Sequence, residues 1–201
     1  MKLVKEIYSY PKLERVETKS GRFYLDSNGV EVPSVTNILS STSDQSGIDE
    51  WKRRVGHDEA ERIMLESTSI GTNVHNALEN YLLGKEWEIY DDDSYISNTS
   101  IKILDTFIKN LISDIDQVWG LEAGLVLDGL YAGTADCIGI FDDKESLIDF
   151  KTAKKLKPKE WIEDYFLQCS AYANAHNVMY GTNINQIVIL MVDRNQEFKK
   201  F

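Results

Sequence analysis

The most informative stretch of this sequence is Gly133-Thr-Ala-Asp-Cys-Ile-Gly-Ile-Phe-Asp-Asp-Lys-Glu-Ser-Leu-Ile-Asp-Phe-Lys151. Two apolar segments flank a short polar turn at 142–144, which predicts two neighbouring antiparallel strands. Because side chains alternate along a strand, Asp149 and Lys151 are expected on one face, with Phe150 on the opposite face in the core. Pairing across the turn brings Asp136 beside Asp149. The stretch therefore predicts two carboxylates and one lysine gathered on one face of a sheet.

The segments around this stretch predict an α/β domain. On the C-terminal side we expect a helix over 158–180, a strand over 187–192 and a short polar tail over 195–201. On the N-terminal side, a strand over 118–127 joins the strand over 130–141 through Asp128-Gly129. Further upstream we expect a hairpin whose strands span 21–26 and 30–32 and turn at Asn28-Gly29. A helix over 34–39 and a polar loop over 41–47 follow. We then expect a helix over 48–65 with a break near Gly56, a helix over 71–83, a loop at 91–93 and a helix over 95–115.

This order of elements predicts a mixed sheet in a single domain. A chain of 201 residues is long enough to bury one core, and the sequence contains no internal repeat or linker. We expect one domain over 1–201, in which 1–68 form an N-terminal hairpin and helical elaboration. Residues 69–193 form the core, with the order helix, three-strand meander, helix, strand.

Composition limits the class of protein. Hydrophobic residues make up 42% and charged residues 27% of the chain, as is usual for a globular protein. The sequence has no apolar run of about 18 residues and no signal-peptide core at its start, so we expect no membrane association. Cys137 and Cys169 are too few for a disulfide framework, which favours a cytoplasmic location.

The net charge of −11 argues against a protein that coats duplex DNA with a uniformly basic surface. An enzyme that acts on nucleic acid needs positive charge only where the phosphates lie. Two basic runs provide it locally. One is Trp51-Lys52-Arg53-Arg54, and the other consists of Lys151, Lys154, Lys155, Lys157 and Lys159. Either run read alone is more often simply a solvated face.

The residues Asp136, Asp149 and Lys151 indicate metal chemistry. Two carboxylates form a hard oxygen site suited to Mg²⁺ or Mn²⁺. A neighbouring lysine can orient or help deprotonate a water and neutralise a phosphate. The alternative is an ordinary surface ion pair. The apolar strand around Asp149 favours the first interpretation, because a charged pair embedded there is unfavourable without a partner or a function.

Two helices carry weaker signals at a spacing of four residues. His75 and Glu79 share one face of the helix over 71–83, although a lone helical histidine is more often structural. Gln168 and Tyr172 share one face of the later helix, where a polar stripe on a half-buried helix is the plainer interpretation.

Together these residues resemble the PD-(D/E)XK nuclease superfamily, in particular its RecB-type exonuclease branch. The motifs that carry the resemblance occur in the family's order: Gly71, Thr72, His75 and Glu79; Gly133 and Asp136; Asp149 and Lys151; Gln168 and Tyr172. Pro33 to Leu39, the Trp51 helix and Val118 to Glu122 extend the resemblance to genome-maintenance exonucleases with phage and bacterial relatives. The chain departs from the family name at Ala135, which precedes Asp136 in place of proline, and it lacks the four cysteines of the iron–sulfur members.

The resemblance implies a restriction-endonuclease-like core and a set of site residues. His75, Asp136, Asp149 and the Phe150 carbonyl would bind Mg²⁺ or Mn²⁺, with Glu79 and Glu122 in support or in structural ion pairs. Asp136, Asp149, Lys151, Gln168 and Tyr172 would form the catalytic group. The N-terminal helices would form an arch over single-stranded DNA. The DNA contacts it implies are Ser34, Thr36, Trp51, Lys52, Arg53, Arg54, Thr72, Thr152, Lys154 and Lys155.

The predicted function is that of a metal-dependent exonuclease that prefers single-stranded DNA with a free end and leaves 5′-phosphates. Such a protein would act in DNA processing, recombination or repair. We expect a monomer in a bacterial cytoplasm, or in the host cytoplasm for a phage protein. A single-strand-binding protein or a replication or recombination protein would be its partner. The alternatives are a structure- or sequence-specific endonuclease on the same fold, and a non-catalytic nucleic-acid-binding module. The second is disfavoured because Asp149 and Lys151 are both present.

Overall fold

The computed structural model describes residues 4–89, 92 and 94–201. Its centre is a five-stranded sheet in the order β4-β5-β6-β7-β8. The strands are β4 (Ile115–Leu127), β5 (Tyr131–Phe141), β6 (Lys144–Ala153), β7 (Gln186–Asp193) and β8 (Phe198–Lys200). β4, β5 and β6 form an antiparallel meander, β7 runs parallel to β6, and β8 is antiparallel to β7. The predicted mixed α/β sheet is confirmed.

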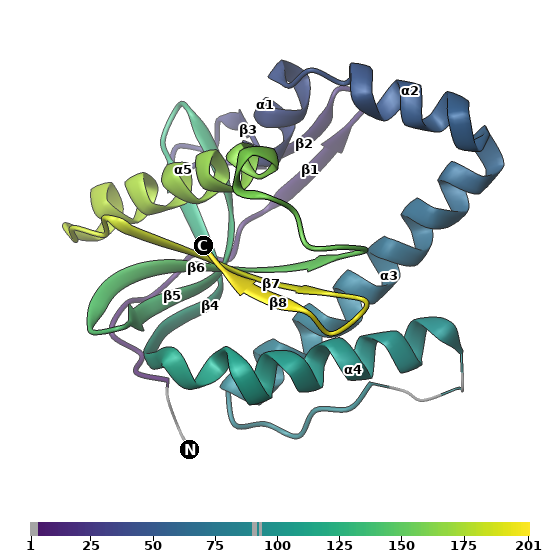
Figure 1. Ribbon diagram of the computed structural model, residues 1–201. Helices are drawn as coiled ribbons and strands as arrows, with labels where there is room; N and C mark the ends of the chain where they lie inside the picture. The colour runs from purple at the N-terminus through teal and green to yellow at the C-terminus, as the bar shows by residue number, and fades with distance from the viewer. Residues whose placement is uncertain (1–3, 90–91, 93) are drawn as a thin grey trace.

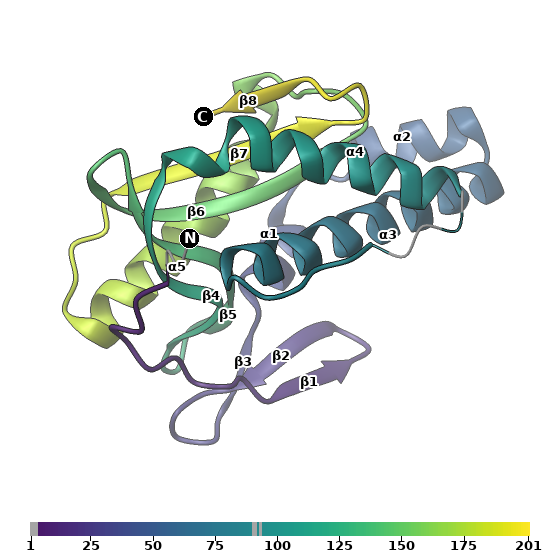
Figure 2. The same cartoon turned by 90° about the horizontal axis from the view of Figure 1, so that it is seen from below.

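Helices cover both faces of this sheet. α3 (His57–Leu82) and α4 (Tyr95–Asn110) lie on one face and α5 (Glu163–Tyr180) lies on the other (Figures 1 and 2). Ile103, Leu104 and Phe107 of α4 are fully buried in the first layer. Cys169 and Ala175 of α5 are fully buried in the second. Each large apolar side chain of these layers contributes about 1.5–3 kcal/mol by leaving water, which fixes the sheet between the helices.

A second, smaller sheet precedes this core. It consists of β1 (Arg15–Thr18), β2 (Gly21–Leu25) and β3 (Glu31–Pro33), in that order. The predicted hairpin corresponds to β2 and β3, whereas β1 was not predicted. Asp26 fixes the turn by accepting hydrogen bonds from the backbone N–H groups of Asn28 and Val30, each at 2.9 Å. Its other oxygen accepts one from Gly129 N–H at 2.9 Å, which ties the small sheet to the β4–β5 turn.

The helical division of the N-terminal half differs from the prediction. α1 (Val35–Thr42) and α2 (Ser46–Val55) leave only residues 43–45 of the predicted 41–47 loop outside helices. The chain then breaks at Gly56, with a φ of 91° that favours glycine, and α3 continues to Leu82 through Gly71. The two helices predicted at 48–65 and 71–83 were therefore wrongly divided, and the division at residue 68 falls inside α3. A mid-helix glycine costs only about 1 kcal/mol, which the burial of Ile70 and Val74 exceeds.

Four further boundaries differ. α4 ends at Asn110, and a 3₁₀ turn (Ile112–Asp114) leads into β4, so the helix predicted to 115 is shorter. The helix predicted from 158 begins at Glu163, after a 3₁₀ turn over Lys159–Trp161. β6 begins at Lys144, inside the predicted 142–144 turn. The polar tail over 195–201 contains β8, because its backbone pairs with the exposed edge of β7. Of the predicted loop at 91–93, residues 91 and 93 lie outside the described residues.

The residues over 46–69, here called the arm, project from the body of the protein (Figure 1). They comprise α2 and the first part of α3, and Ala60 is their one buried residue. Hydrogen bonds hold the arm near both ends, from Ser43 Oγ to Asp164 at 3.0 Å and from Arg194 to Ser67 Oγ at 2.8 Å. Across the described residues, no helix is long and apolar enough to cross a bilayer.

Candidate active site

The site begins where β5 parts from β6. β5 and β6 are paired from the turn as far as Cys137 and Ile148. The next residue of β5, Asp136, is not paired with β6. There the Asp136 carboxylate takes the place of a backbone acceptor, since its Oδ2 accepts a hydrogen bond from Phe150 N–H at 2.9 Å. Because the strands separate here, the Asp136 carboxylate reaches the backbone of Phe150, between Asp149 and Lys151.

Asp149 and Lys151 form a buried ion pair on β6. Lys151 Nζ lies 2.7 Å from Oδ1 and 2.6 Å from Oδ2 of Asp149. Only the contact with Oδ1 has hydrogen-bond geometry, and the buried Oδ2 accepts no hydrogen bond from any residue that the structure describes. The Asp149 side chain is 3% exposed, against 20% for Lys151.

Charge and burial shift both members of this pair. Burial, and then the Asp136 carboxylate, raise the pKa of Asp149 to about 6, while Lys151 opposes this rise. For Lys151, burial favours the neutral amine, but the carboxylates of Asp149 and Asp136 outweigh it and raise the pKa above its ordinary value. Lys151 is therefore an ammonium at neutral pH.

His75 reaches the site from α3. Its Nδ1 lies 3.7 Å from Asp136 Oδ2, too far for a hydrogen bond, and its ring meets the Phe150 ring edge-on at 6.4 Å. Its imidazole nitrogen and the Asp136 carboxylate therefore face one another without a direct hydrogen bond.

Glu122 is placed more centrally than the sequence indicated. It lies on β4 opposite Asp136, between the pairs Leu121–Cys137 and Ala123–Ala135. Glu122, His75 and Asp136 each offer one ligand atom within 4.8 Å of the other two. Loss of hydration, and then the Asp136 carboxylate, raise the pKa of Glu122 to about 7. Glu79, one helical turn beyond His75, adds to this rise.

Tyr172 and Gln168 border the site from α5. Tyr172 is 4% exposed and packs so closely on β5 that a Cβ added at Gly133 would lie 2.6 Å from its hydroxyl. Burial raises the pKa of Tyr172, and a hydrogen bond with Gln168 opposes the rise.

Sequence reasoning missed Tyr165, and it placed Lys157 only in a basic run. Lys151 Nζ lies 5.0 Å from the centre of the Tyr165 ring, and Lys157 Nζ donates a hydrogen bond to Tyr165 Oη at 2.7 Å. The spacing of three residues between Tyr165 and Gln168 on one helix was the available signal.

The donors of this site fit a divalent cation. The set combines an imidazole with carboxylates, which suits Mg²⁺ and Mn²⁺. Among the described residues, the buried Asp149 Oδ2 accepts no hydrogen bond, although Lys151 Nζ lies 2.6 Å away. A carboxylate oxygen with an unused lone pair can also serve as a ligand to a divalent cation.

No family model matches the chain. The chain is similar to three curated proteins named "Mitochondrial genome maintenance exonuclease 1". The protein of Xenopus tropicalis is 31% identical over 181 residues, which are 81% of this chain and 49% of the relative. The human protein is 30% identical over 157 residues (73% and 44%), and the mouse protein is 32% identical over 161 residues (73% and 44%). The similarity supports an exonuclease family.

The similarity to these exonucleases covers only part of their length. The chain spans about half the length of the curated relatives that it matches. Their names assign them to mitochondria, and the cytoplasmic location expected for this chain stays a prediction.

The residues predicted to contact DNA differ in exposure, and four of them lie on the arm. Arg53 and Arg54 are exposed in the last turn of α2, and Trp51 and Lys52 are half-buried beside them. The other exposed or half-buried members are Thr36, Thr72, Thr152, Lys154 and Lys155. Ser34 is the buried member of this set. It is 2% exposed, and its hydroxyl accepts a hydrogen bond from Asn37 N–H as the cap of α1, so this hydroxyl serves the helix.

Proposed function

We propose that this protein is a divalent-metal-dependent DNA exonuclease of the PD-(D/E)XK type with a restriction-endonuclease-like core. It removes nucleotides from a free end of single-stranded DNA. The observation that carries the proposal is the buried Asp149–Lys151 ion pair, whose carboxylate is near enough to Asp136 and His75 to interact with both electrostatically. The similarity to exonucleases supports the same chemistry.

In this proposal His75, Asp136, Asp149 and the Phe150 carbonyl hold Mg²⁺ or Mn²⁺. The bound cation would supply a more acidic water and stabilise the charge that develops on the phosphate. Lys151 stays protonated beside Asp149, so its ammonium neutralises the phosphate and orients the water rather than removing its proton. Tyr172 and Gln168 position the DNA strand or Lys151 from the α5 side.

The arm and the segment after β6 would guide the strand. Lys52, Arg53 and Arg54 provide positive charge on the arm, and Lys154 provides it on the body. The pKa of Glu59 on the arm is lowered mainly by its hydrogen bond with Arg62, and Lys154 adds a smaller contribution across the gap. Trp51 offers a ring for base stacking. A basic path with an aromatic platform suits a flexible single strand better than a stiff duplex.

A time course on end-labelled single strands tests the proposal. Mg²⁺ or Mn²⁺ should support release of short products from the ends, EDTA should abolish it, and Ca²⁺ should bind without turnover. Asp149→Asn and Lys151→Ala should each lower the rate by at least about 10²-fold, whereas Lys144→Ala, an exposed lysine at the start of β6, should not. Full activity in EDTA would reject the metal site. Rapid nicking of closed single-stranded circles would instead favour an endonuclease.

A further inference from the structure

The small sheet carries an arginine whose hydrogen-bonding capacity is only partly used. Arg22 lies on β2 directly opposite Glu17 of β1. Its Nε is 3.6 Å from Glu17 Oε1, which is too far for a hydrogen bond. Although 42% of the Arg22 side chain is exposed, this nitrogen is buried and has no hydrogen-bond partner among the described residues. A buried N–H without an acceptor is unfavourable, so the position suits an anion that supplies one.

Arg22 lines a pocket of about 360 Å³ between the small sheet and α1, which lies where the arm begins (Figure 1). The other side chains that line it are all polar or charged: Arg15, Glu17, Ser34, Thr36, Asn37 and Ser40. Two guanidinium groups meet one carboxylate there, so the pocket is locally positive in a chain whose net charge is −11. Guanidinium groups bind phosphate oxygens through paired N–H donors, and amide and hydroxyl groups add neutral donors. The chemistry of the pocket therefore fits a phosphate group.

The pocket lies on the same edge of β5 as the active site. β6 leaves this edge of β5 unpaired before Cys137, and Ser34, the cap of α1, forms a bridge with Ala132. Because Val126 of β4 already pairs with Ala132 on the opposite edge, Ser34 must occupy the edge that β6 leaves. Asp136 follows Ala132 by four residues, about 13 Å at about 3.3 Å per residue. A stacked DNA strand covers this distance in about four nucleotides.

The face of the small sheet that carries Arg22 is turned toward the body of the protein. Side chains two residues apart share one face of a strand, so Tyr24 lies on the Arg22 face of β2. Tyr24 is 6% exposed and packs with Ala132 of β5. The next residue of β5, Gly133, is in close contact with Tyr172 at the border of the active site. A DNA strand that passes Tyr172 can therefore continue along the small sheet to Arg22.

We propose that Arg22 and Arg15 bind an internal phosphate of the DNA strand in this pocket, outside the metal site. The inference rests on the proposed nuclease function and extends it, because only Ser34 and Thr36 of the predicted DNA contacts line the pocket. The two arginine side chains are 42% and 50% exposed, which leaves room for a strand that continues past them. Glu17 pairs with both arginines in the free protein, so the phosphate competes with this carboxylate.

Binding of labelled single-stranded oligonucleotides to the whole chain, measured by fluorescence anisotropy in EDTA, tests the inference. Arg22→Ala should weaken binding about tenfold. The slope of log affinity against log salt should fall by about 0.7, because one phosphate contact is lost. Lys109→Ala also removes an exposed cation that pairs with a carboxylate, Asp105, at 3.2 Å, and it should change neither value. The loss in Arg22→Ala should be the same for strands with and without a 5′-terminal phosphate.

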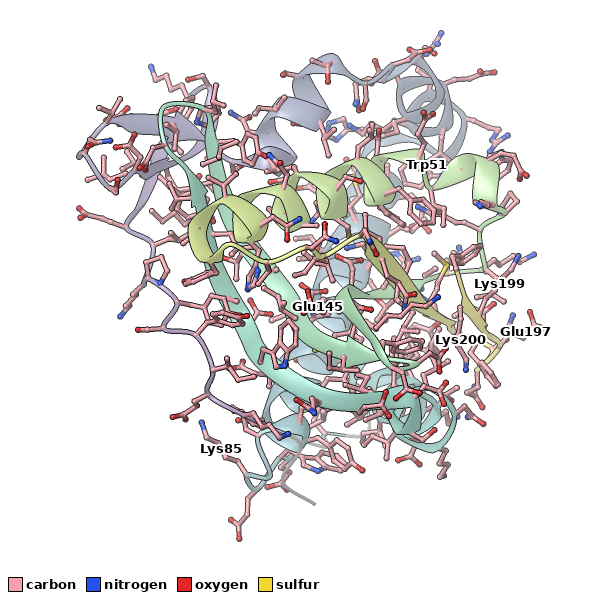
Figure 3. The ribbon with its side chains drawn as sticks, turned by 90° about the vertical axis from the view of Figure 1, so that its left-hand side faces the viewer. Trp51, Lys85, Glu145, Glu197, Lys199 and Lys200 are labelled. Carbon is pink, nitrogen blue, oxygen red and sulfur yellow. The ribbon has the colours of Figure 1, made fainter. Side chains whose placement is uncertain are left out.

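The opposite change at Glu17 gives a result that a folding defect cannot imitate. Glu17→Gln should tighten binding about threefold, in the range of a surface ion pair, because both arginines become free for the phosphate. Glu145→Gln removes another exposed carboxylate, near the β5–β6 turn (Figure 3), and should leave the affinity unchanged. When Arg15→Ala and Arg22→Ala are also present, Glu17→Gln should have no effect.

The outcomes separate the inference from the proposed function. Equal affinities for Arg22→Ala and Lys109→Ala, in a chain that still cleaves DNA, would overturn the phosphate pocket and leave the nuclease proposal intact. Equal tightening by Glu17→Gln and Glu145→Gln would show an effect of net charge alone and would also overturn it. A loss confined to strands with a terminal phosphate would contradict an internal phosphate as the ligand. A wild-type chain that neither binds nor cleaves single-stranded DNA would reject the proposed function together with the inference.

Discussion

Removing Lys151 and removing Asp149 should have different effects on the stability of the protein. Lys151 has Asp136 and the Tyr165 ring as further neighbours, and 20% of its side chain meets solvent. Among the residues that the structure describes, Asp149 forms an ion pair with Lys151 alone. Lys151→Ala should therefore leave a buried carboxylate beside Asp136, with a pKa above its present value of about 6.

The stability of Lys151→Ala should consequently depend on pH. A carboxyl whose folded pKa is raised keeps its full stability below the unfolded pKa of about 3.9 and loses it as pH rises through the folded pKa. Because Lys151 is partly exposed, urea unfolding in EDTA should show a loss of about 1–3 kcal/mol at pH 8, the cost of a buried acceptor left unsatisfied, and less at pH 5. Asp149→Asn has no ionisable group at this position and should lack this pH dependence. Lys144→Ala should show only the pH dependence of the wild type. An equal loss at both pH values would contradict the pair as described.

Gly133 and Gly71 belong to the recognised motifs but have different physical roles. A Cβ at Gly133 would lie 2.6 Å from the Tyr172 hydroxyl, whereas one at Gly71 would lie 3.5 Å from Thr152 Oγ1, an ordinary contact. Gly133→Ala should lower stability by about 1–3 kcal/mol and reduce nuclease activity, because Tyr172 must move. Gly71→Ala should be neutral or raise stability by up to about 1 kcal/mol. Thermal unfolding and the end-label assay would measure both, and matching losses would show that the close contact is unimportant.

Among the elements, strands bounded by strong turn signals were predictable and helix divisions were not. The turns at Asp128-Gly129 and Asp142-Asp143 and the cap at Ser34 depend on local chemistry, which sequence reveals. The run of α3 through Gly71 and the pairing of β8 depend on neighbours distant in the chain. The same limit applied to the site. Asp136, Asp149 and Lys151 follow from strand alternation, but no sequence rule predicts a left-handed Glu122.

The N-terminal segment is joined to α5 through His176, which is fully buried. Thr182 Oγ1 donates to Asn177 Oδ1 at 2.8 Å, so it accepts from His176 Nδ1–H at 2.8 Å. The remaining nitrogen, Nε2, then accepts from the Tyr10 hydroxyl at 3.0 Å. This network assigns the tautomer and keeps the ring neutral, and burial lowers the pKa of His176 to about 4.

Folding should therefore weaken in mild acid. Because the folded pKa lies below the unfolded value of about 6.5, the unfolded chain binds the proton first. The contribution is present above about pH 6.5 and is lost as pH falls toward 4, by an amount on the order of 3 kcal/mol. Among the rings around His176, burial raises the pKa values of Tyr10 and Tyr180, so these two stay neutral in this range. Denaturant unfolding at pH 7.5 and 5 should show a smaller difference for His176→Gln than for the wild type. An unchanged difference would place the acid sensitivity elsewhere.

The molecule as a whole is acidic, and few contacts connect the arm to its body. The net charge of −11 repels DNA at long range, so binding must depend on local basic groups. In Figure 3, Trp51 of the arm and Lys85 lie at opposite ends of the molecule, and Lys199 lies on β8. These positions provide a matched comparison, since reversing two charges on the arm or two elsewhere changes the net charge equally.

Arg53→Glu with Arg54→Glu should weaken binding of single-stranded DNA at least about tenfold. The slope of log affinity against log salt should fall by about 1.4, because each phosphate contact on a single strand contributes about 0.7. Lys85→Glu with Lys199→Glu should change the slope little. Hydrolysis of a small phosphodiester, which does not reach the arm, should be unchanged in both. If the two double variants weaken binding equally, general repulsion explains the loss and the arm is not the path of the strand. If only the arm variant loses affinity and closed circles resist cleavage, a strand that enters by its free end is the explanation that remains.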